Sequence, residues 1–397
     1  MESFIRGSCE TMCPKAEIDM RTRERMLHFY ELKPGSRTEP VQRLVVKEFA
    51  RSAAGVRRPK HWEIRTVGAL RRTVEYLLTE VVPDERRPYN FRYEFIFDRL
   101  RAVRQEVVMQ NLAAKDTLDI LEPIVCFLAY SAYVLCESHI NEFDPKICST
   151  HLQECLKKVL RCYDDLDEES TPYNQNRRIR MEALYLAFNL GSSEALTRGI
   201  SLPKNIRKRL SLQLSMNIEY LRYNFHRVLL LIQKLPPLEA ALATLKVPTI
   251  RQQLLLRFST AFQSKVLSVP LEWIAHVLLY QRREHSSLIE DCHHYNLQLV
   301  QVEESPTPDQ STVAQHTSAP VITPKDAWWD DDSDDEKDKD HNPSTAISSV
   351  LAGRSVKFEK TRFDSSKSVV QPRRMELVDR KLGAVTSISG MLLEGKC

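Results

Sequence analysis

Two cysteines near the N-terminus, Cys9 and Cys13, are the residues whose type and spacing come nearest to a chemical site. A tetrahedral zinc site needs four sulfur or imidazole ligands, commonly supplied as two close pairs. The other close group of such ligands is Cys292, His293 and His294, and neighbouring helical residues point to different sides. The nine cysteines of the chain include no C-x2-C pair. We therefore expect no metal site, and we expect Cys9 and Cys13 to be small packing residues.

Cys13 could also act as a nucleophile, because Pro14 begins a helix and a helix N-terminus lowers the pKa of a thiol. Covalent catalysis further requires a base that a third group orients. The histidines His28 and His61 follow no recognisable catalytic order. No G-x-x-x-x-G-K-[ST] or G-x-G-x-x-G motif occurs, and only 10 residues are glycine. We expect a protein that is not an enzyme and that binds no cofactor and no small-molecule substrate.

The charge of the chain is unevenly distributed. The net charge is +4, but residues 301–345 hold 12 acidic residues and 3 lysines, so they carry −9 and the remainder carries +13. A basic body of this kind fits either an anionic partner or an ordinary solvated surface. Basic residues concentrate in two clusters, at residues 51–72 around Trp62 and at residues 198–210.

These clusters could bind RNA weakly, because cations neutralise phosphates and an aromatic ring stacks on a base. The possible nucleic-acid contacts are Arg57, Arg58, Lys60, Trp62, Arg71, Arg72, Lys204, Arg207, Lys208 and Arg209. The other interpretation is that both clusters are solvated helix faces.

Residues 1–60 predict an N-terminal arm that contains one helix. Pro14 begins the helix and a polar run reaches Glu31. Glu17 and Arg21 are one helical turn apart, so an ion pair between them would stabilise the helix. Too few apolar residues are present for a clear stripe, so the arm must dock on the body or on a partner. The structural motif consists of Cys9, Cys13, Pro14, Glu17 and Arg21.

Residues 61–245 predict an α-helical body, because apolar residues recur every three or four positions. The stretch 117–140 is apolar nearly all round, which indicates a central buried helix. Its uncharged run at residues 123–136 is too short to span a membrane, and no secretory signal precedes it. Gly191 is expected to end one helix, and Ser192 or Ser193 to cap the next. We expect no membrane partner.

Residues 246–302 predict helix, turn, helix and strand, which is the outline of a winged-helix module. Glu284, Glu290 and Asp291 lie on its second helix and the turn before it, where they would repel DNA phosphates. We therefore expect the module to dock proteins. Trp273 falls beside the buried stripe of the preceding helix, and we expect it at the join between body and module as a partner-docking residue.

Residues 303–397 predict a mostly disordered acidic tail. Its Pro/Ser/Thr-rich stretch cannot bury enough surface to offset the entropy of ordering. Trp328 and Trp329 precede the acidic run. They are either anchors for a partner's groove or incidental exposed rings of a linker. Short strands or helices are expected in the last fifty residues, which include the stretch 355–364.

Three stretches resemble the SAC/GANP family and come in the order of that family. They are GSCETMCPKAEIDMR at 7–21, VKEFARSAAG at 46–55 and LYLAFNLGSSEAL at 184–196. The resemblance runs from about residue 7 to about residue 302. It implies an all-α fold, a PCI-like and TPR-like stack of helical hairpins followed by a small winged helix. It also implies protein partners, namely another PCI-type scaffold subunit and a small acidic subunit, and possibly RNA.

The same resemblance implies a non-catalytic scaffold. By size the chain is most similar to short family members that act in centrosome duplication, spindle assembly and mitotic progression. Such a protein is expected in the cytoplasm, at centrosomes and on the spindle, with a nuclear pool. The alternative is an RNA-binding subunit of a nuclear messenger-RNA export or transcription-coupled complex.

Overall fold

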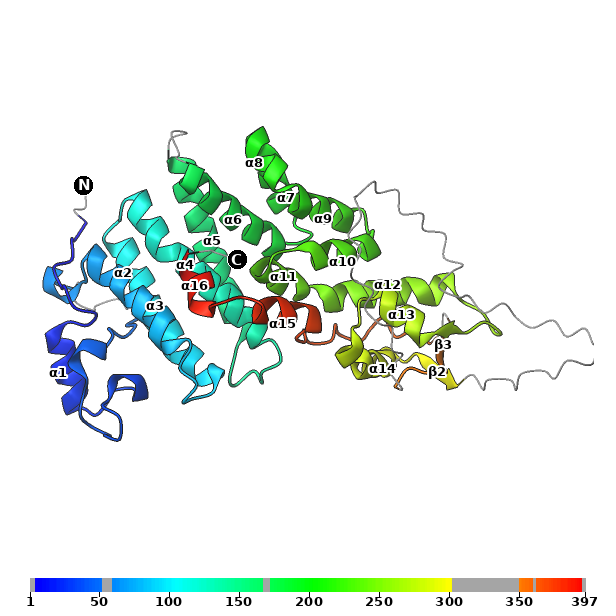
Figure 1. Ribbon diagram of the computed structural model, residues 1–397, viewed down its shortest axis with the longest axis horizontal. Coiled ribbons are helices and arrows are strands. Elements are labelled where there is room, and N and C mark those ends of the chain that lie inside the picture. The colour runs from blue at the N-terminus through cyan, green and yellow to red at the C-terminus, as the bar shows by residue number, and fades with distance from the viewer. Residues whose placement is uncertain (1–3, 52–58, 167–171, 302–349, 360–361, 395–397) are drawn as a thin grey trace, which may run out of the picture. The chain divides into compact units, whose positions relative to one another are not determined.

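A computed structural model describes residues 4–51, 59–166, 172–301, 350–359 and 362–394, and most of these residues are helical (Figure 1). The chain forms two compact units. The first unit comprises Met1–Asn217, Leu235–Ala243 and Arg380–Cys397, and the second comprises Ile218–Lys234 and Thr244–Asp379. The prediction of a helical protein is confirmed. Its finer assignment as PCI-like and TPR-like stays a prediction.

The N-terminal arm holds one short helix and a series of turns. Helix α1 spans Lys15–Arg23 and follows Pro14, whose fixed φ suits a helix start. Three 3-10 turns lie at Phe29–Glu31, Gln42–Leu44 and His61–Glu63. The sequence predicted one helical run as far as Glu31. The helix ends earlier because Arg25 takes a left-handed backbone conformation, with φ of 57°.

The helices of the first unit pack beside their neighbours in the chain. They are α2 (Val67–Tyr76), which continues into a π-helical turn (Leu77–Val81), α3 (Tyr89–Met109), α4 (Ala114–Val134), α5 (Pro145–Asp165), α6 (Pro172–Phe188), α7 (Ser193–Ser201), α8 (Lys204–Arg209), α9 (Ser211–Leu221) and α11 (Pro237–Thr244). Each helix from α3 to α7 contacts the next (Figure 1). Gly191 lies at the end of α6 with φ of 87°, and Ser192 Oγ caps α7, as the sequence predicted.

Helix α4 is the centre of this core. Helices α2, α3 and α5 pack against it, and so does α16 (Ile388–Glu394), which is red in Figure 1. By length and composition alone α4 could cross a membrane, but 83% of its most apolar window is buried inside the protein. Such burial is typical of a core helix. Met391 and Leu392 of α16 are buried, and Arg180 Nη2 donates to Met391 O at 2.8 Å.

The second unit combines helices with a small sheet. Its elements are α10 (Phe225–Lys234), α12 (Val247–Ala261), β1 (Val269–Pro270), α13 (Leu271–Val277), α14 (His285–His294), β2 (Gln298–Gln301), β3 (Arg354–Lys357) and the start of α15 (Glu376–Gly383). The strand order is β1-β3-β2, and both pairings are antiparallel. Val356 lies opposite Val269 on one side and Leu299 on the other. Strand β1 precedes helices α13 and α14, strand β2 follows them, and the winged-helix assignment stays a prediction.

The boundary of the tail differs from the prediction. Strand β3 is the central strand of the sheet, although its residues were assigned to a mostly disordered tail at 303–397. Helices α15 and α16 also lie in that range, and they bury apolar side chains such as Val378 and Leu392. A strand can pair with the edge of a strand that lies far away in the sequence. Strand β3 therefore joins β1 and β2 although a long stretch of chain separates it from them. Residues 302–349, with Trp328 and Trp329, lie outside the described residues.

Candidate functional site

The N-terminal arm is fastened by backbone contacts to the segment that precedes α2. Cys9 and Arg65 form a parallel β-bridge, in which Cys9 N donates to Ile64 O at 3.0 Å and Thr66 N to Cys9 O at 2.9 Å. Gly7 lies against the same segment, and a Cβ there would fall 2.6 Å from Ile64 O. Such a contact is too short for a carbon atom. The path of the arm therefore depends on a glycine at this position.

Cys13 lies in a small apolar core that holds α1 in place. Its side chain is 1% exposed and packs with Ile18 and Val45. Burial raises the pKa of the Cys13 thiol, and a protonated thiol is neither a strong nucleophile nor a metal ligand. In the described ranges no group of three or more His, Cys, Asp or Glu residues is placed to hold a metal ion. The geometry gives Cys13 a packing role.

Arg21 is the centre of a buried charge network. Its Nη2 donates a hydrogen bond to Glu31, its Nη1 donates to Val46 O at 3.0 Å, and its Nε lies 3.4 Å from Glu48 Oε2. The predicted partner was Glu17, whose Oε1 lies 3.9 Å from Arg21 Nη1. Glu31 is therefore the main partner of Arg21, and Glu17 makes the longest of these contacts.

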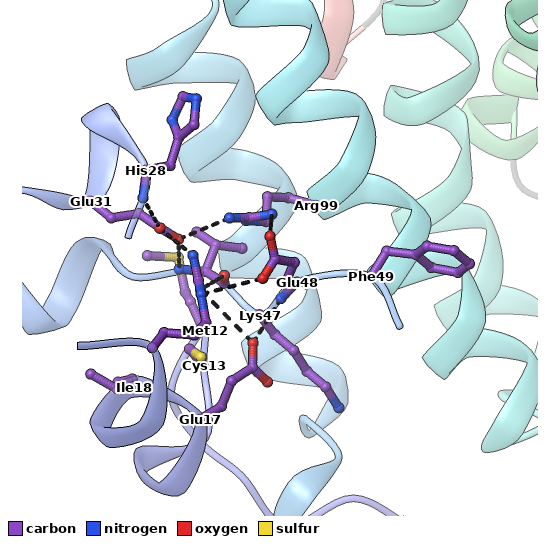
Figure 2. Close-up of polar contacts among 12 residues, drawn as sticks. Met12, Cys13, Glu17, Ile18, His28, Glu31, Lys47, Glu48, Phe49 and Arg99 are labelled. Carbon is purple, nitrogen blue, oxygen red and sulfur yellow. Dashed lines mark hydrogen bonds and ion pairs between the residues drawn. The ribbon is translucent and has the colours of Figure 1, made fainter. Parts of the chain in front are cut away.

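Glu31 joins three parts of the chain. Its Oε2 accepts from His28 N at 2.8 Å, and its Oε1 accepts from Val46 N at 3.1 Å. Arg99 of α3 completes the network, with Nη2 at 3.4 Å from Glu31 Oε1 and Nη1 at 3.4 Å from Glu48 Oε1 (Figure 2). Charge-assisted hydrogen bonds therefore link the arm to the helical body.

Two of the stretches singled out in the sequence meet at this network. Lys47 N donates to Met12 O at 3.0 Å, and Glu48 N donates to Glu17 Oε1 at 2.9 Å. The stretch at 7–21 is thereby joined to the stretch at 46–55. Burial raises the pKa of Glu17, while its hydrogen bond from Glu48 N favours the ionised form.

A second buried ion pair lies beside the first network. Arg65 Nε is 2.9 Å from Glu106 Oε2, and Lys47 Nζ also donates to Glu106. Gln110 Nε2 donates to Arg65 O at 3.0 Å. Arg65 belongs by position to the basic cluster at 51–72. Its side chain is fully buried, so it is not available to a phosphate.

His28 contributes an aromatic ring to the arm. Its ring centroid lies 4.4 Å from that of Phe95 and 4.9 Å from that of Phe91, with the rings stacked. Burial, and after it the nearby charge of Arg99, lower the pKa of His28 to about 4. The imidazole is therefore neutral at pH 7 and packs as an aromatic ring.

Two residues of the first basic cluster are held by acids or carbonyls. Arg71 Nη2 lies 2.7 Å from Asp116 Oδ1 and 2.8 Å from Asp119 Oδ2. Arg72 Nη2 donates to Glu10 O at 2.6 Å and lies 3.6 Å from its Oε2. These contacts neutralise both guanidinium groups, so Arg71 and Arg72 are poor phosphate ligands. A count of basic residues in the sequence could not show that acids of α4 and of the arm bind these two arginines.

The remainder of that cluster is small. Trp62 is 48% exposed, and Lys60 Nζ lies 4.7 Å from its ring centroid. A cation over an exposed ring leaves both groups at the surface. Arg57 and Arg58 lie outside the described residues.

The second basic cluster forms an exposed patch on α8, which we call the α8 patch: Lys204, Arg207 and Lys208. Within the part of the chain that the structure describes, none of the three makes an ion pair. Arg209 is exposed too, but it donates to Asn176 Oδ1. Among the described residues, the α8 patch is thus a part of the predicted nucleic-acid surface whose cations form no ion pair.

Trp273 packs inside its own unit. Its ring centroid lies 5.4 Å from that of Phe258 on α12 and 5.6 Å from that of Phe262, the residue that follows the end of α12. The side chain is half-buried. The aromatic contacts therefore join α13 to α12, and both helices belong to the second unit.

The acidic residues of the winged helix are mostly internal. Glu284 Oε2 lies 3.0 Å from Arg251 Nη2, and Asp291 Oδ1 lies 2.8 Å from Arg373 Nη1. Glu284 and Asp291 are buried, so their charges are neutralised locally. The prediction that these acids would repel DNA phosphates does not hold for Glu284 and Asp291, because basic partners far away in sequence cover them. Glu290 alone of the three is exposed, and it too contacts Arg373.

Sequence reasoning missed the residues that receive the arm. Arg99 and Glu106 of α3 lie within a run of buried apolar residues, next to Leu100 and Val107. A charged residue on an apolar face is rare unless it has a partner. That pattern could have marked both positions, although it would not have named their partners.

The family of the chain follows from its match to a protein-family model. The model described as the SAC3/GANP family matches residues 12–301. This span is more than half of the chain. The chain belongs to the SAC3/GANP family. The predicted resemblance is therefore confirmed.

Three relatives within the family illustrate the relation. Protein xmas of Drosophila melanogaster is 26% identical over 312 residues, which cover 75% of this chain and 15% of that protein. SAC3 family protein B of Arabidopsis thaliana is 30% identical over 172 residues, which cover 41% and 10%. SAC3 family protein 1 of Schizosaccharomyces pombe is 30% identical over 164 residues, which cover 40% and 15%. The chain spans only about a tenth to a seventh of these relatives.

The SAC3/GANP family is of scaffold type and is not known as a family of enzymes. Its proteins work in multi-protein complexes. The geometry of the arm agrees with such a role, because its charged groups bind one another.

Proposed function

We propose that this SAC3/GANP chain is a non-catalytic scaffold subunit of a nuclear messenger-RNA export complex. The observation that carries the proposal is the network of Arg21, Glu31 and Arg99, which uses the charges of the arm to fix the arm on α3. A catalytic site would direct polarised groups toward a substrate. Here the groups are directed inward and bind one another, so we infer that they position a surface on which partners dock.

The family supports the cellular setting. Relatives that share this region include SAC3 family proteins, and the family works in multi-protein complexes. The partners we propose are another PCI-type scaffold subunit and a small acidic subunit. The alternative is a cytoplasmic protein that acts in centrosome duplication and spindle assembly. The test must distinguish this role from messenger-RNA export.

Affinity purification of the full chain with mass spectrometry, with and without nuclease, tests the proposal. We expect recovery of a second PCI-type subunit that survives nuclease, and nuclear staining in interphase cells. Recovery of centrosomal proteins, with staining at spindle poles, would instead support the alternative. Recovery of no stable partner under either condition would contradict the scaffold function itself.

We further propose that the α8 patch binds RNA weakly and without sequence preference. Lys204, Arg207 and Lys208 are exposed cations of one short helix, and their charges are free to neutralise phosphates. Reversal of Arg207 and Lys208 to Glu should weaken binding to a uridine oligomer and flatten its salt dependence by about one unit of log–log slope per lost contact.

The matched control reverses two exposed cations outside the patch, Arg23 and Lys33, to Glu. Each of these already contacts a neighbouring acid. If the control lowers RNA affinity as much as reversal of the α8 patch, the binding reflects net charge and the patch has no special role. Absence of RNA binding by the wild-type chain at low salt would also refute the proposal.

A further inference from the structure

A largely apolar groove of about 490 Å³ lies on the first unit, between α3 and α5. Its lining includes Val107 and Met109 of α3, Leu121 of α4 and Cys155 of α5. Val108 stands beside them with 70% of its surface exposed. An exposed valine at the edge of an apolar groove is a feature of interaction sites.

The edge of the groove is cationic. Arg101, Arg104 and Lys158 line it together with a single acid, Glu154, so the lining carries +3 − 1 = +2. Glu154 Oε2 is bound to Arg104 at 2.8 Å. Lys158 is exposed, and in the described residues no acid pairs with it. The free positive charge therefore lies around an apolar floor.

The arm supplies one end of this groove. Phe49 lines it, and the guanidinium of Arg101 lies 3.9 Å from the Phe49 ring centroid. Phe49 N donates to Asp98 Oδ2 at 3.2 Å, which fixes the residue on α3. Figure 2 shows the Phe49 side chain pointing away from the Arg21 network. The arm therefore contributes one lining residue to the groove.

The two walls have a matching helical period. Four of the six lining residues on α3 are 101, 104, 105 and 108, and the lining residues on α5 are 151, 154, 155 and 158. Each series runs i, i+3, i+4, i+7 along one helix face. At 1.5 Å per residue, seven residues extend over roughly 10 Å, or two turns. A groove of this kind suits a short amphipathic helix with anchors at the same spacing.

We propose that this groove binds an acidic amphipathic helix of a partner protein. The apolar anchors of the helix would cover Val108 and Met109, and its carboxylates would face Arg101 and Lys158. The proposal rests on the scaffold function and specifies the chemistry of one docking segment. RNA is the less suitable occupant, because the floor is aliphatic and the Phe49 face is already covered by Arg101.

A synthetic peptide of about four helical turns, with leucines at i, i+4 and i+7 and glutamates elsewhere, is the probe. Binding to the full chain is measured by fluorescence anisotropy at low and at moderate salt. We expect saturable binding that weakens with salt, because rim charges are screened. A peptide with the same composition and scrambled leucines should bind much less, and one with lysine in place of glutamate should not bind.

Two pairs of variants locate the site. Val108→Asp should weaken peptide binding roughly tenfold, whereas Val266→Asp, at a valine 77% exposed in the second unit, should not. Lys158→Glu should weaken binding more than Lys157→Glu, because Lys157 is adjacent but does not line the groove. All four positions are at the surface, so the fold should survive each change.

Equal loss in both members of either pair would overturn the proposal, and so would equal binding of the scrambled peptide. Displacement of the peptide by a uridine oligomer, with the oligomer's affinity also lowered by Val108→Asp, would assign the groove to RNA instead. The proposed scaffold function is tested separately by partner recovery from cells. Recovery of partners by wild type and Val108→Asp alike, together with failure of the peptide to bind, would reject the groove and retain the scaffold.

Discussion

Arg65 Nε lies 2.9 Å from Glu106 Oε2, and neither side chain has more than 2% of its surface exposed. Arg65 N also donates to Glu106 Oε2 at 3.1 Å. One carboxylate thus binds the side chain and the backbone of the residue that pairs with Cys9. Glu106 therefore stabilises the fold and also holds the segment to which the N-terminal arm binds.

Glu106→Leu should lower the free energy of unfolding by about 3–5 kcal/mol, because it leaves the buried charge of Arg65 without its partner. The measurement is urea denaturation followed by circular dichroism. The double variant Arg65→Met/Glu106→Leu should be less destabilised than Glu106→Leu alone. Arg71→Ala is the control, since its half-exposed pair should contribute under about 1 kcal/mol. Equal effects of Glu106→Leu and Arg71→Ala would contradict the assignment.

Gly7→Ala should release the N-terminal arm, because its Cβ would overlap the carbonyl oxygens of Ile64 and Arg65. We expect faster cleavage of the first fifty residues in limited proteolysis, with the helical body still folded. Gly383→Ala is a matched control, because a Cβ at Gly383 meets no atom within 4 Å. An unchanged cleavage rate in Gly7→Ala would show that the arm adjusts without detaching.

His28 should make the protein less stable as the pH falls from about 6.5 to about 4. Its pKa is about 4 in the folded protein, lowered by burial and then by Arg99, against 6.5 in the unfolded chain. In that window the unfolded chain binds the proton and the native state does not, so stability is lost by roughly 2–3 kcal/mol. His28→Phe should flatten this dependence, measured by urea denaturation at pH 7.5 and pH 4. An unaltered difference between the two pH values would disprove it.

Glu239 should make the protein less stable as the pH rises, which is opposite to the dependence expected from His28. Burial raises the pKa of Glu239 to about 7, although Gln213 Nε2 donates to its Oε2 at 2.6 Å. The native state keeps its proton where the unfolded chain has lost it, so the stability it contributes is present below pH 4.5 and lost as the pH rises through 7. Glu239→Gln should therefore stabilise the protein by roughly 2–3 kcal/mol at pH 8 and little at pH 4. Thermal unfolding at both pH values checks this, and an equal gain at both would refute it.

Trp273→Ala should loosen the contact between α13 and α12, because Phe258 and Phe262 lose their aromatic partner. The cost should be about 2 kcal/mol, below that of a fully buried ring. Hydrogen exchange should quicken in the second unit and stay unchanged in α4 and α5. Faster exchange in α4 of the same variant would show that the ring stabilises more than its own unit.

The sequence allowed the helices to be predicted well, because their apolar residues recur at the period of a helix. Gly191 and Ser192 were correctly assigned to a helix end and a cap, since both roles depend on local backbone geometry. The arm helix was predicted too long because nothing in the sequence marks Arg25 for a left-handed conformation. Local rules therefore succeed where local interactions decide the structure.

The charge network could be predicted only in part. Glu17 and Arg21 are one turn apart, and that spacing suggested a pair that is the longest contact of Arg21. Glu31, ten residues from Arg21, is the nearer partner, and Glu31 also binds Arg99 on another helix. Long-range partners of a charged residue follow from packing, which a count of nearby residues does not contain. The same reason explains why the contacts of Arg71 with Asp116 and of Arg72 with Glu10 could not be predicted.

The central position of β3 has a consequence for the order of synthesis. Strands β1 and β2 each pair with β3, and the described chain shows no direct pairing between them. During translation both strands emerge before residues 354–357, so each waits with an unpaired edge, a site where chains can associate wrongly. A fragment that stops at residue 301, where the family match ends, would remain in that state. The long connection adds little entropy cost, because loop closure grows only slowly with length.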